Sequence, residues 1–148
     1  LVFFLSLFIV EESRGKVPDV MLRCEPTWSV DQHKKYPMRF LTLTDFYDIS
    51  SLGSANIYSY VDQGPGGLFL NVTEVKVYEG SNLKYLYIDG PTKIGSELNR
   101  ETLILSVRGY PNAQCFILSD KKTIDKYLED HKKLINGLKD NQLKKNQI

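Results

Sequence analysis

The chain has 148 residues, a length that suits one domain rather than two. Its 19 basic and 18 acidic residues give a formal net charge of +1, so the composition does not predict nucleic-acid binding. The nine Tyr and seven Phe residues favour a β-rich fold, because aromatic side chains suit the half-buried surface of a sheet.

The chain begins with ten residues, LVFFLSLFIV, that are apolar apart from Ser6. This run is shorter than the ~20 residues that a membrane-spanning helix needs, so we expect no stable membrane insertion. It is typical of the central part of a secretory signal peptide. We therefore predict a secreted, extracellular protein with a signal peptide over residues 1–15, truncated at its start and cleaved between Ser13 and Lys16. An apolar first strand is the alternative interpretation.

Secretion would place the two cysteines, Cys24 and Cys115, in an oxidising compartment. Two cysteines allow a single intramolecular pairing, so we predict a Cys24–Cys115 disulfide. A bridge across so long a loop stabilises the fold by roughly 4 kcal/mol in the loop-entropy model. Asn71-Val72-Thr73 is a glycosylation sequon, and we predict a glycan on Asn71 because the secretory pathway modifies such sites.

Residues 18–37 are predicted to be irregular, unless Trp28 lies on a strand. Downstream, runs rich in β-branched and aromatic residues alternate with turn signals. The predicted strands are 38–47, 56–61, 68–78 (with a break point near Thr73), 83–88, 92–98, 102–107 and 114–119. The predicted turns are 50–54, 62–67, 79–82 and 89–91.

The connections between these strands are short enough for hairpins, and no helix intervenes, which favours antiparallel pairing. Apolar residues occupy both phases of several strands, as in 83–88, so both faces of the sheet need cover. Such a sheet must also close to hide its edges. We therefore predict an all-β fold over residues 16–140, an eight-stranded antiparallel up-and-down barrel with a C-terminal amphipathic α-helix. A partly opened barrel or a sandwich is the alternative.

The predicted helix follows the last strand and has an apolar stripe at spacings of three and four. The stripe consists of Ile124, Tyr127, Leu128, His131, Leu134, Ile135 and Leu138. Asp120 or Thr123 is the predicted N-cap and Gly137 the predicted C-cap. We expect the stripe to pack on the outside of the sheet, and residues 141–148 to form a flexible tail.

This arrangement resembles the lipocalin family, and in particular secreted arthropod lipocalins, over Cys24 to about Lys139. Pro26-Thr27-Trp28 resembles the family's Gly-x-Trp motif, with Pro in place of Gly. Leu43-Thr44-Asp45-Phe46-Tyr47 is similar to the second strand of arthropod lipocalins, and Phe116-Ile117-Leu118-Ser119 with the helix is similar to the family's last strand and helix.

The chain also departs from the family pattern, as an outlier would. Asn99-Arg100-Glu101 stands near the place of the family's Thr-Asp-Tyr motif. Asp120 occupies the position of the Arg that normally packs across the Trp, and Lys121 follows it. In this resemblance, Lys121 would take over the cation–π contact with Trp28.

The resemblance, together with the apolar residues on both strand phases, implies a barrel that transports or scavenges a small hydrophobic ligand. Fatty acids, retinoids, pigments and amines are the expected ligand types. The expected cavity residues are Trp28, Phe40, Tyr58, Tyr60, Phe69, Leu70, Val72, Tyr85 and Tyr87. Leu70 and Val72 are included because a glycosylated Asn71 must face outward, and alternation then turns its neighbours inward.

The alternative function is a secreted protein-binding inhibitor or immune modulator with a filled barrel, which would contact its partner through residues 31–36 and 62–67. We expect no enzyme, cofactor or metal site. His33 and His131 lack partners at metal-ligand spacing, and paired cysteines leave no thiol nucleophile. The glycine-rich run at 64–67 lacks the Lys and helix of a phosphate-binding loop.

Overall fold

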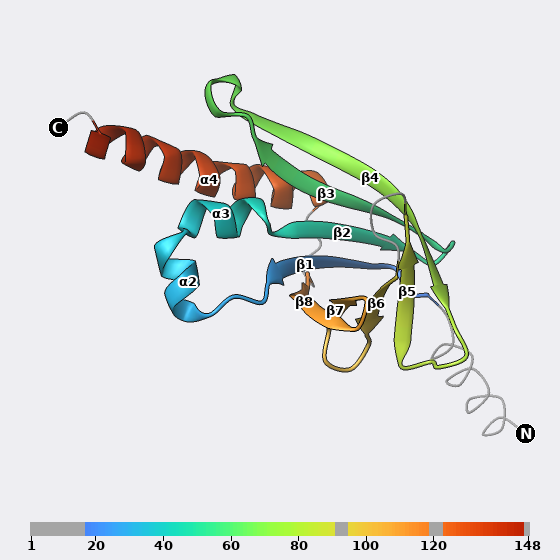
Figure 1. Ribbon diagram of the computed structural model, residues 1–148. Coiled ribbons are helices and arrows are strands. Elements are labelled where there is room, and N and C mark those ends of the chain that lie inside the picture. The colour runs from blue at the N-terminus through green and yellow to red at the C-terminus, as the bar shows by residue number, and fades with distance from the viewer. Residues whose placement is uncertain (1–16, 91–94, 119–122, 147–148) are drawn as a thin grey trace, which may run out of the picture.

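The computed structural model describes residues 17–90, 95–118 and 123–146, and it contains a closed barrel of eight strands (Figure 1). The strands are β1 Val20–Pro26, β2 Asp45–Ser50, β3 Ser54–Asp62, β4 Leu68–Glu79, β5 Tyr85–Asp89, β6 Ser96–Asn99, β7 Ile104–Val107 and β8 Tyr110–Ile117. Each strand pairs antiparallel with the next, and β8 pairs with β1 to close the barrel. The predicted up-and-down barrel with its C-terminal helix is therefore confirmed. The predicted signal peptide at 1–15 lies outside the described residues.

Two short helices, α2 Val30–Lys35 and α3 Pro37–Thr42, connect β1 to β2. The prediction of a strand over 38–47 was therefore wrong for its first half. Pro37 occupies the first turn of α3, where its fixed φ angle favours a helix and its missing N–H costs nothing. Met38 and Leu41 are three residues apart, so α3 presents both to the same apolar cluster.

The first strand, β1, lies in the segment that was predicted to be irregular. Leu22 and Cys24 face the core at 2% exposure, while Arg23 between them is only half-buried. Strand pairing on both sides, with β2 and β8, holds this segment extended. Trp28 follows the end of β1 by two residues and precedes α2, so it does not lie on a strand.

The remaining elements run close to their predicted positions, with three differences. β4 continues through Thr73 without a break. The long helix α4, Ile124–Asn146, extends through Gly137 and most of the predicted tail, so Gly137 is not its C-cap. The predicted N-cap Asp120 lies outside the described residues, and the backbone oxygen of Thr123 accepts the first helical hydrogen bonds. None of the helices in the described part of the chain has the length and apolar character of a membrane span.

The interior of the barrel is filled by one apolar cluster whose members are at most 6% exposed. It consists of Leu22, Cys24, Tyr47, Ile49, Ala55, Ile57, Val75, Val77, Leu86, Ile88, Leu98, Leu105, Ala113 and Cys115. Within it, Cys24 and Cys115 form the predicted disulfide between directly opposed positions of β1 and β8. The bridge therefore joins the two strands that close the barrel, which are 91 residues apart in sequence.

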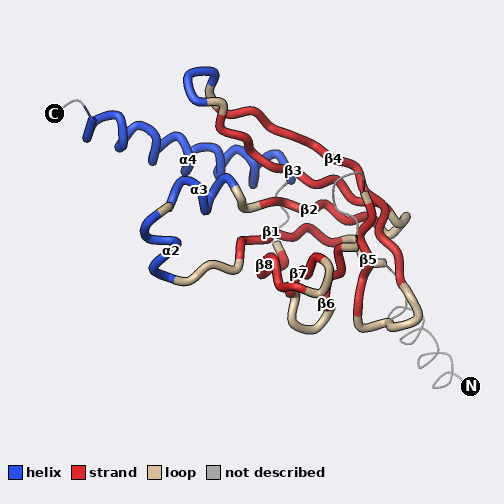
Figure 2. Tube along the Cα trace, in the orientation of Figure 1, coloured by secondary structure: helices blue, strands red, loops and turns tan. Residues whose placement is uncertain are grey.

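A second apolar cluster lies outside the barrel, where α4 and α3 cover the outer face of β2, β3 and β4 (Figure 2). Its buried members are Phe46, Tyr60, Leu128 and Ile135. The Tyr60 hydroxyl donates a hydrogen bond of 2.9 Å to the backbone oxygen of Leu128. The prediction that the helix packs on the outside of the sheet is confirmed, although Leu134 of the predicted stripe is 59% exposed.

Candidate ligand-binding cavity

A cavity of about 740 Å³ opens at the end of the barrel where α2 and α3 connect β1 to β2. Its wall is formed by the end of β1, by α3, by the start of β2, by the end of β3 and by the start of β8. This volume falls within the range of roughly 300–1,000 Å³ that is usual for small-molecule sites. The cavity is therefore large enough for a small ligand.

The floor of the cavity is apolar and belongs to the barrel core. Cys24, Leu105 and Ala113 line the cavity and are also members of the interior cluster. Below them the barrel is packed with side chains, including Tyr47 and Leu86 at 1% exposure. Among the described residues, this packed core therefore closes the cavity on the side of the barrel interior.

A carboxylate and a hydroxyl form a polar pair on the wall of the cavity. The Ser59 hydroxyl donates a hydrogen bond of 2.7 Å to Oδ1 of Asp45, and both residues line the cavity. Asp45 begins β2 two residues before Tyr47, so alternation places both on the inward face. Burial raises the pKa of Tyr47, and the negative charge of Asp45 raises it further, so Tyr47 stays neutral. Asp45 thus places a negative charge above an apolar floor.

The rim of the cavity is contributed by α3 and by the end of β3. Arg39 and Thr42 of α3 line it on one side, and Asp62 of β3 lines it on the other. Lys139 of α4 donates to Oδ1 of Asp62 at 2.7 Å and also to the backbone oxygen of Gly64 at 3.4 Å. The hydrogen bonds that the Asp62 carboxylate accepts from Lys139 and from the backbone N–H of Gly64 lower the pKa of Asp62. The tip of the β3–β4 hairpin is in this way attached to α4.

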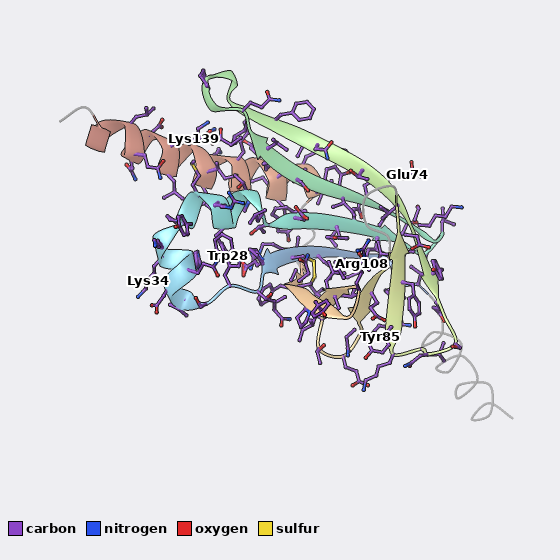
Figure 3. All side chains as sticks on the ribbon, viewed as in Figure 1. Trp28, Lys34, Glu74, Tyr85, Arg108 and Lys139 are labelled. Atoms are coloured by element: carbon purple, nitrogen blue, oxygen red, sulfur yellow. A yellow bond between two sulfur atoms is a disulfide. The ribbon has the colours of Figure 1, made fainter. Side chains whose placement is uncertain are left out.

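Trp28 lines the cavity from the loop between β1 and α2 (Figure 3). Its ring meets the edge of Phe40 with the centroids 6.0 Å apart. On α2, His33 stacks on the same Phe40 ring at 3.7 Å. Because Phe40 contacts both, this aromatic group packs α2 and α3 against the Trp28 side of the cavity.

Two of the nine predicted cavity residues, Trp28 and Tyr60, line this cavity, and Tyr60 directs its hydroxyl to α4. The other seven are placed elsewhere. Phe40, Tyr58 and Leu70 pack beside α2 or in the outer cluster, Phe69 and Val72 are about half exposed, and Tyr85 and Tyr87 have the opposite phase to the buried Leu86 and Ile88. Tyr87 instead stacks on Tyr78 at 5.7 Å.

The phase argument from the sequon was reversed. Val75 and Val77 face the core, so alternation along β4 gives Asn71 the inward phase and Leu70 and Val72 the outward phase. Asn71 is nevertheless exposed. This part of β4 pairs with β3 alone among the described strands, since β5 meets β4 only at 76–79, and so it extends past the body of the barrel. The exposure of Asn71 therefore does not place it on the outer face of the barrel, as the sequence argument had assumed.

Sequence reasoning missed the polar residues of the cavity, Asp45 and Ser59 above all. A signal for Asp45 was present, because it shares the phase of Tyr47 and Ile49 and so interrupts an otherwise apolar face of β2. No comparable signal marked Arg39 or Thr42, since their segment was interpreted as a strand.

The expected contact of Lys121 with Trp28 lies outside the described residues. Among the residues that the structure places, no group of three or more His, Cys, Asp or Glu side chains is arranged to hold a metal ion. Comparisons with models of protein families, with curated proteins and with solved structures gave no match. The fold and the cavity geometry are therefore the basis for a functional proposal.

Proposed function

We propose that this chain is a secreted, lipocalin-like protein that binds a small molecule in the mouth of its barrel, for transport or scavenging. The observation that carries the proposal is the cavity of about 740 Å³, with its apolar floor and the Asp45–Ser59 pair on its wall. The disulfide across the barrel seam supports secretion, because such bridges persist in oxidising compartments.

The shape of the cavity favours a compact ligand. In the described part of the chain, the packed core beneath Cys24, Leu105 and Ala113 leaves no room along the barrel axis for a long acyl or polyene chain. The Asp45 carboxylate favours a ligand with a cationic or hydrogen-bond-donating group, since such contacts are among the strongest polar ones. Of the expected ligand types, an amine with an apolar body fits these two conditions best. Burial of that body would contribute roughly 25 cal/mol per Å² of apolar area.

Native mass spectrometry with three probes tests this proposal. Tryptamine represents a compact aromatic amine, palmitate a fatty acid and retinol a polyene. We expect a one-to-one complex with tryptamine and weaker or no complexes with the two long probes. Tight binding of palmitate or retinol would contradict the compact-ligand assignment, and the failure of all three would contradict the carrier function.

A second candidate function is a protein-binding module, and exposed apolar side chains near the mouth favour it. Val30 is the first residue of α2 and is 70% exposed, Tyr36 follows α2 at 47%, and Leu43 follows α3 at 45%. Substitution of Val30 and Tyr36 by Ser, neither of which lines the cavity, would abolish capture of a protein partner but leave tryptamine binding intact. The reverse result would support the small-molecule function.

A further inference from the structure

Part of β4 has an edge that none of the described strands covers. It is 12 residues long, and β3 pairs with it from Leu68 to Lys76. On its other side, β5 pairs only with residues 76–79. Among the described residues, Leu68–Thr73 therefore has a strand on one side and none on the other, and Figure 1 shows β4 along the outer border of the projecting hairpin.

This edge lacks the features that usually prevent strand pairing between molecules. Natural edge strands carry charges, proline or bulges, because their free N–H and C=O groups otherwise accept another strand. The segment Leu68–Thr73 reads LFLNVT and contains neither a charged residue nor proline. It also exposes apolar surface on both faces, since Phe69 is 52% exposed and Val72 is 51% exposed. The edge is thus open to another strand and apolar on both sides.

A second copy of the same edge is a suitable partner. Antiparallel pairing of two identical strands about a two-fold axis through Asn71 places Leu70 opposite Val72 and Phe69 opposite Thr73. No like charges meet in this arrangement, and each exposed apolar side chain gains an uncharged neighbour. The strand is already paired antiparallel with β3, so it needs no change of backbone conformation to pair again.

The glycosylation sequon lies at the centre of this edge. Asn71 is exposed, and its side-chain amide donates a hydrogen bond of 3.5 Å to the Thr73 hydroxyl of the same sequon. A bulky glycan on Asn71 would lie on the two-fold axis of the paired strands and would exclude the second copy. We propose that the free edge of β4 is a self-association interface and that glycosylation of Asn71 closes it. This proposal is independent of ligand binding.

The test compares the oligomeric state of wild-type protein and of Asn71→Gln, both expressed through a eukaryotic secretory pathway. Light scattering after size exclusion, from about 1 μM to about 100 μM, covers the affinity expected for a small interface. We expect glycosylated wild type to be a monomer and Asn71→Gln to reach twice the monomer mass. Hydrogen exchange should slow at the amides of 68–73 in the dimer. If the sequon carries no glycan, wild type itself must dimerise.

Two further substitutions in the Asn71→Gln background locate the interface. Val72→Lys places a charge on the edge and should restore the monomer. Leu52→Lys is the matched control, because Leu52 is 93% exposed in the turn between β2 and β3, and it should leave the dimer intact. A monomeric unglycosylated protein, or a dimer that survives Val72→Lys without protection at 68–73, would overturn the proposal.

Discussion

His131 of α4 lies 2.7 Å from Leu41 of α3, measured from the imidazole Nε2 to the backbone oxygen. The oxygen can only accept, so the imidazole donates from Nε2. This hydrogen bond joins the helix on the outside of the barrel to the helix that forms part of the cavity rim. The His131 ring also meets Phe46 and Tyr60, with centroids 5.1 Å and 6.2 Å away.

The environment of His131 disfavours its charged form. Burial lowers the pKa of His131, and this effect outweighs the hydrogen bond to Leu41, which raises it. Of the nearby charged groups, Arg23 lowers the pKa, and Glu25 and Asp45 raise it. The folded protein therefore holds His131 neutral at a pH where the unfolded chain is already partly protonated.

We expect the free energy of unfolding to decrease as the pH falls below about 6.5, the ordinary pKa of histidine. In this window the unfolded chain binds a proton at position 131 that the folded chain resists, so acid favours unfolding. His131→Phe should reduce the difference in stability between about pH 7.5 and about pH 5, measured by urea unfolding. Equal pH dependence in wild type and His131→Phe would contradict the prediction.

The disulfide should account for much of the stability of the barrel. Replacing both Cys24 and Cys115 by Ala removes a link across 91 residues and should lower the free energy of unfolding by roughly 4 kcal/mol. Urea unfolding of the variant and of wild type, with and without reductant, measures this difference. Reductant should affect wild type alone, and a variant as stable as oxidised wild type would show that the bridge contributes little.

Tyr60→Phe should destabilise the protein by about 1 kcal/mol, because it removes the hydrogen bond from the Tyr60 hydroxyl to Leu128. Thermal unfolding measures the effect. Tyr110→Phe makes the same chemical change at a residue that is 77% exposed, and it should change stability by less than about 0.5 kcal/mol. Equal effects of the two substitutions would indicate that the contact with α4 does not stabilise the barrel.

Asp45→Asn should weaken the binding of a cationic ligand by about tenfold or more, because it removes the cavity carboxylate while preserving side-chain size. Asp48→Asn is the matched control, since Asp48 lies on the same strand but on its opposite face. Titration calorimetry with tryptamine measures both. A similar loss in the two variants would indicate long-range attraction rather than a contact in the cavity.

The ion pair between Lys139 of α4 and Asp62 of β3 should hold the tip of the β3–β4 hairpin in place. Lys139→Gln removes the 2.7 Å contact between Nζ and Oδ1 and should speed hydrogen exchange at the tip, residues 62–68. Lys133→Gln breaks an exposed ion pair with Glu129 on the same helix and should leave that exchange unchanged. Unaltered exchange in Lys139→Gln would contradict this role of the contact.

Local sequence patterns located most of the elements correctly. The turn signal around Gly64 and the alternation from Leu68 to Tyr78 are properties of a few neighbouring residues, so β3, β4 and their connection were predictable. The apolar stripe of α4 is equally local. The prediction of a strand over 38–47 was wrong for its first half because Met38, Phe40 and Leu41 occur in both strands and helices. Packing of Met38 and Leu41 against the apolar cluster of α4 favours the helix.

By itself, the sequence determined the antiparallel barrel, the helix after it and the pairing of the two cysteines, because periodicity, turn residues and cysteine count are read along the chain. Only the tertiary structure decided which phase of each strand faces inward, and therefore which residues line the cavity. That choice depends on the faces covered by α3 and α4, which are contacts between residues far apart in sequence. Asp45 and Ser59 meet because the register of the β2–β3 hairpin, which pairs Phe46 with Tyr58, places them opposite each other, and that register depends on which strand phase faces the core.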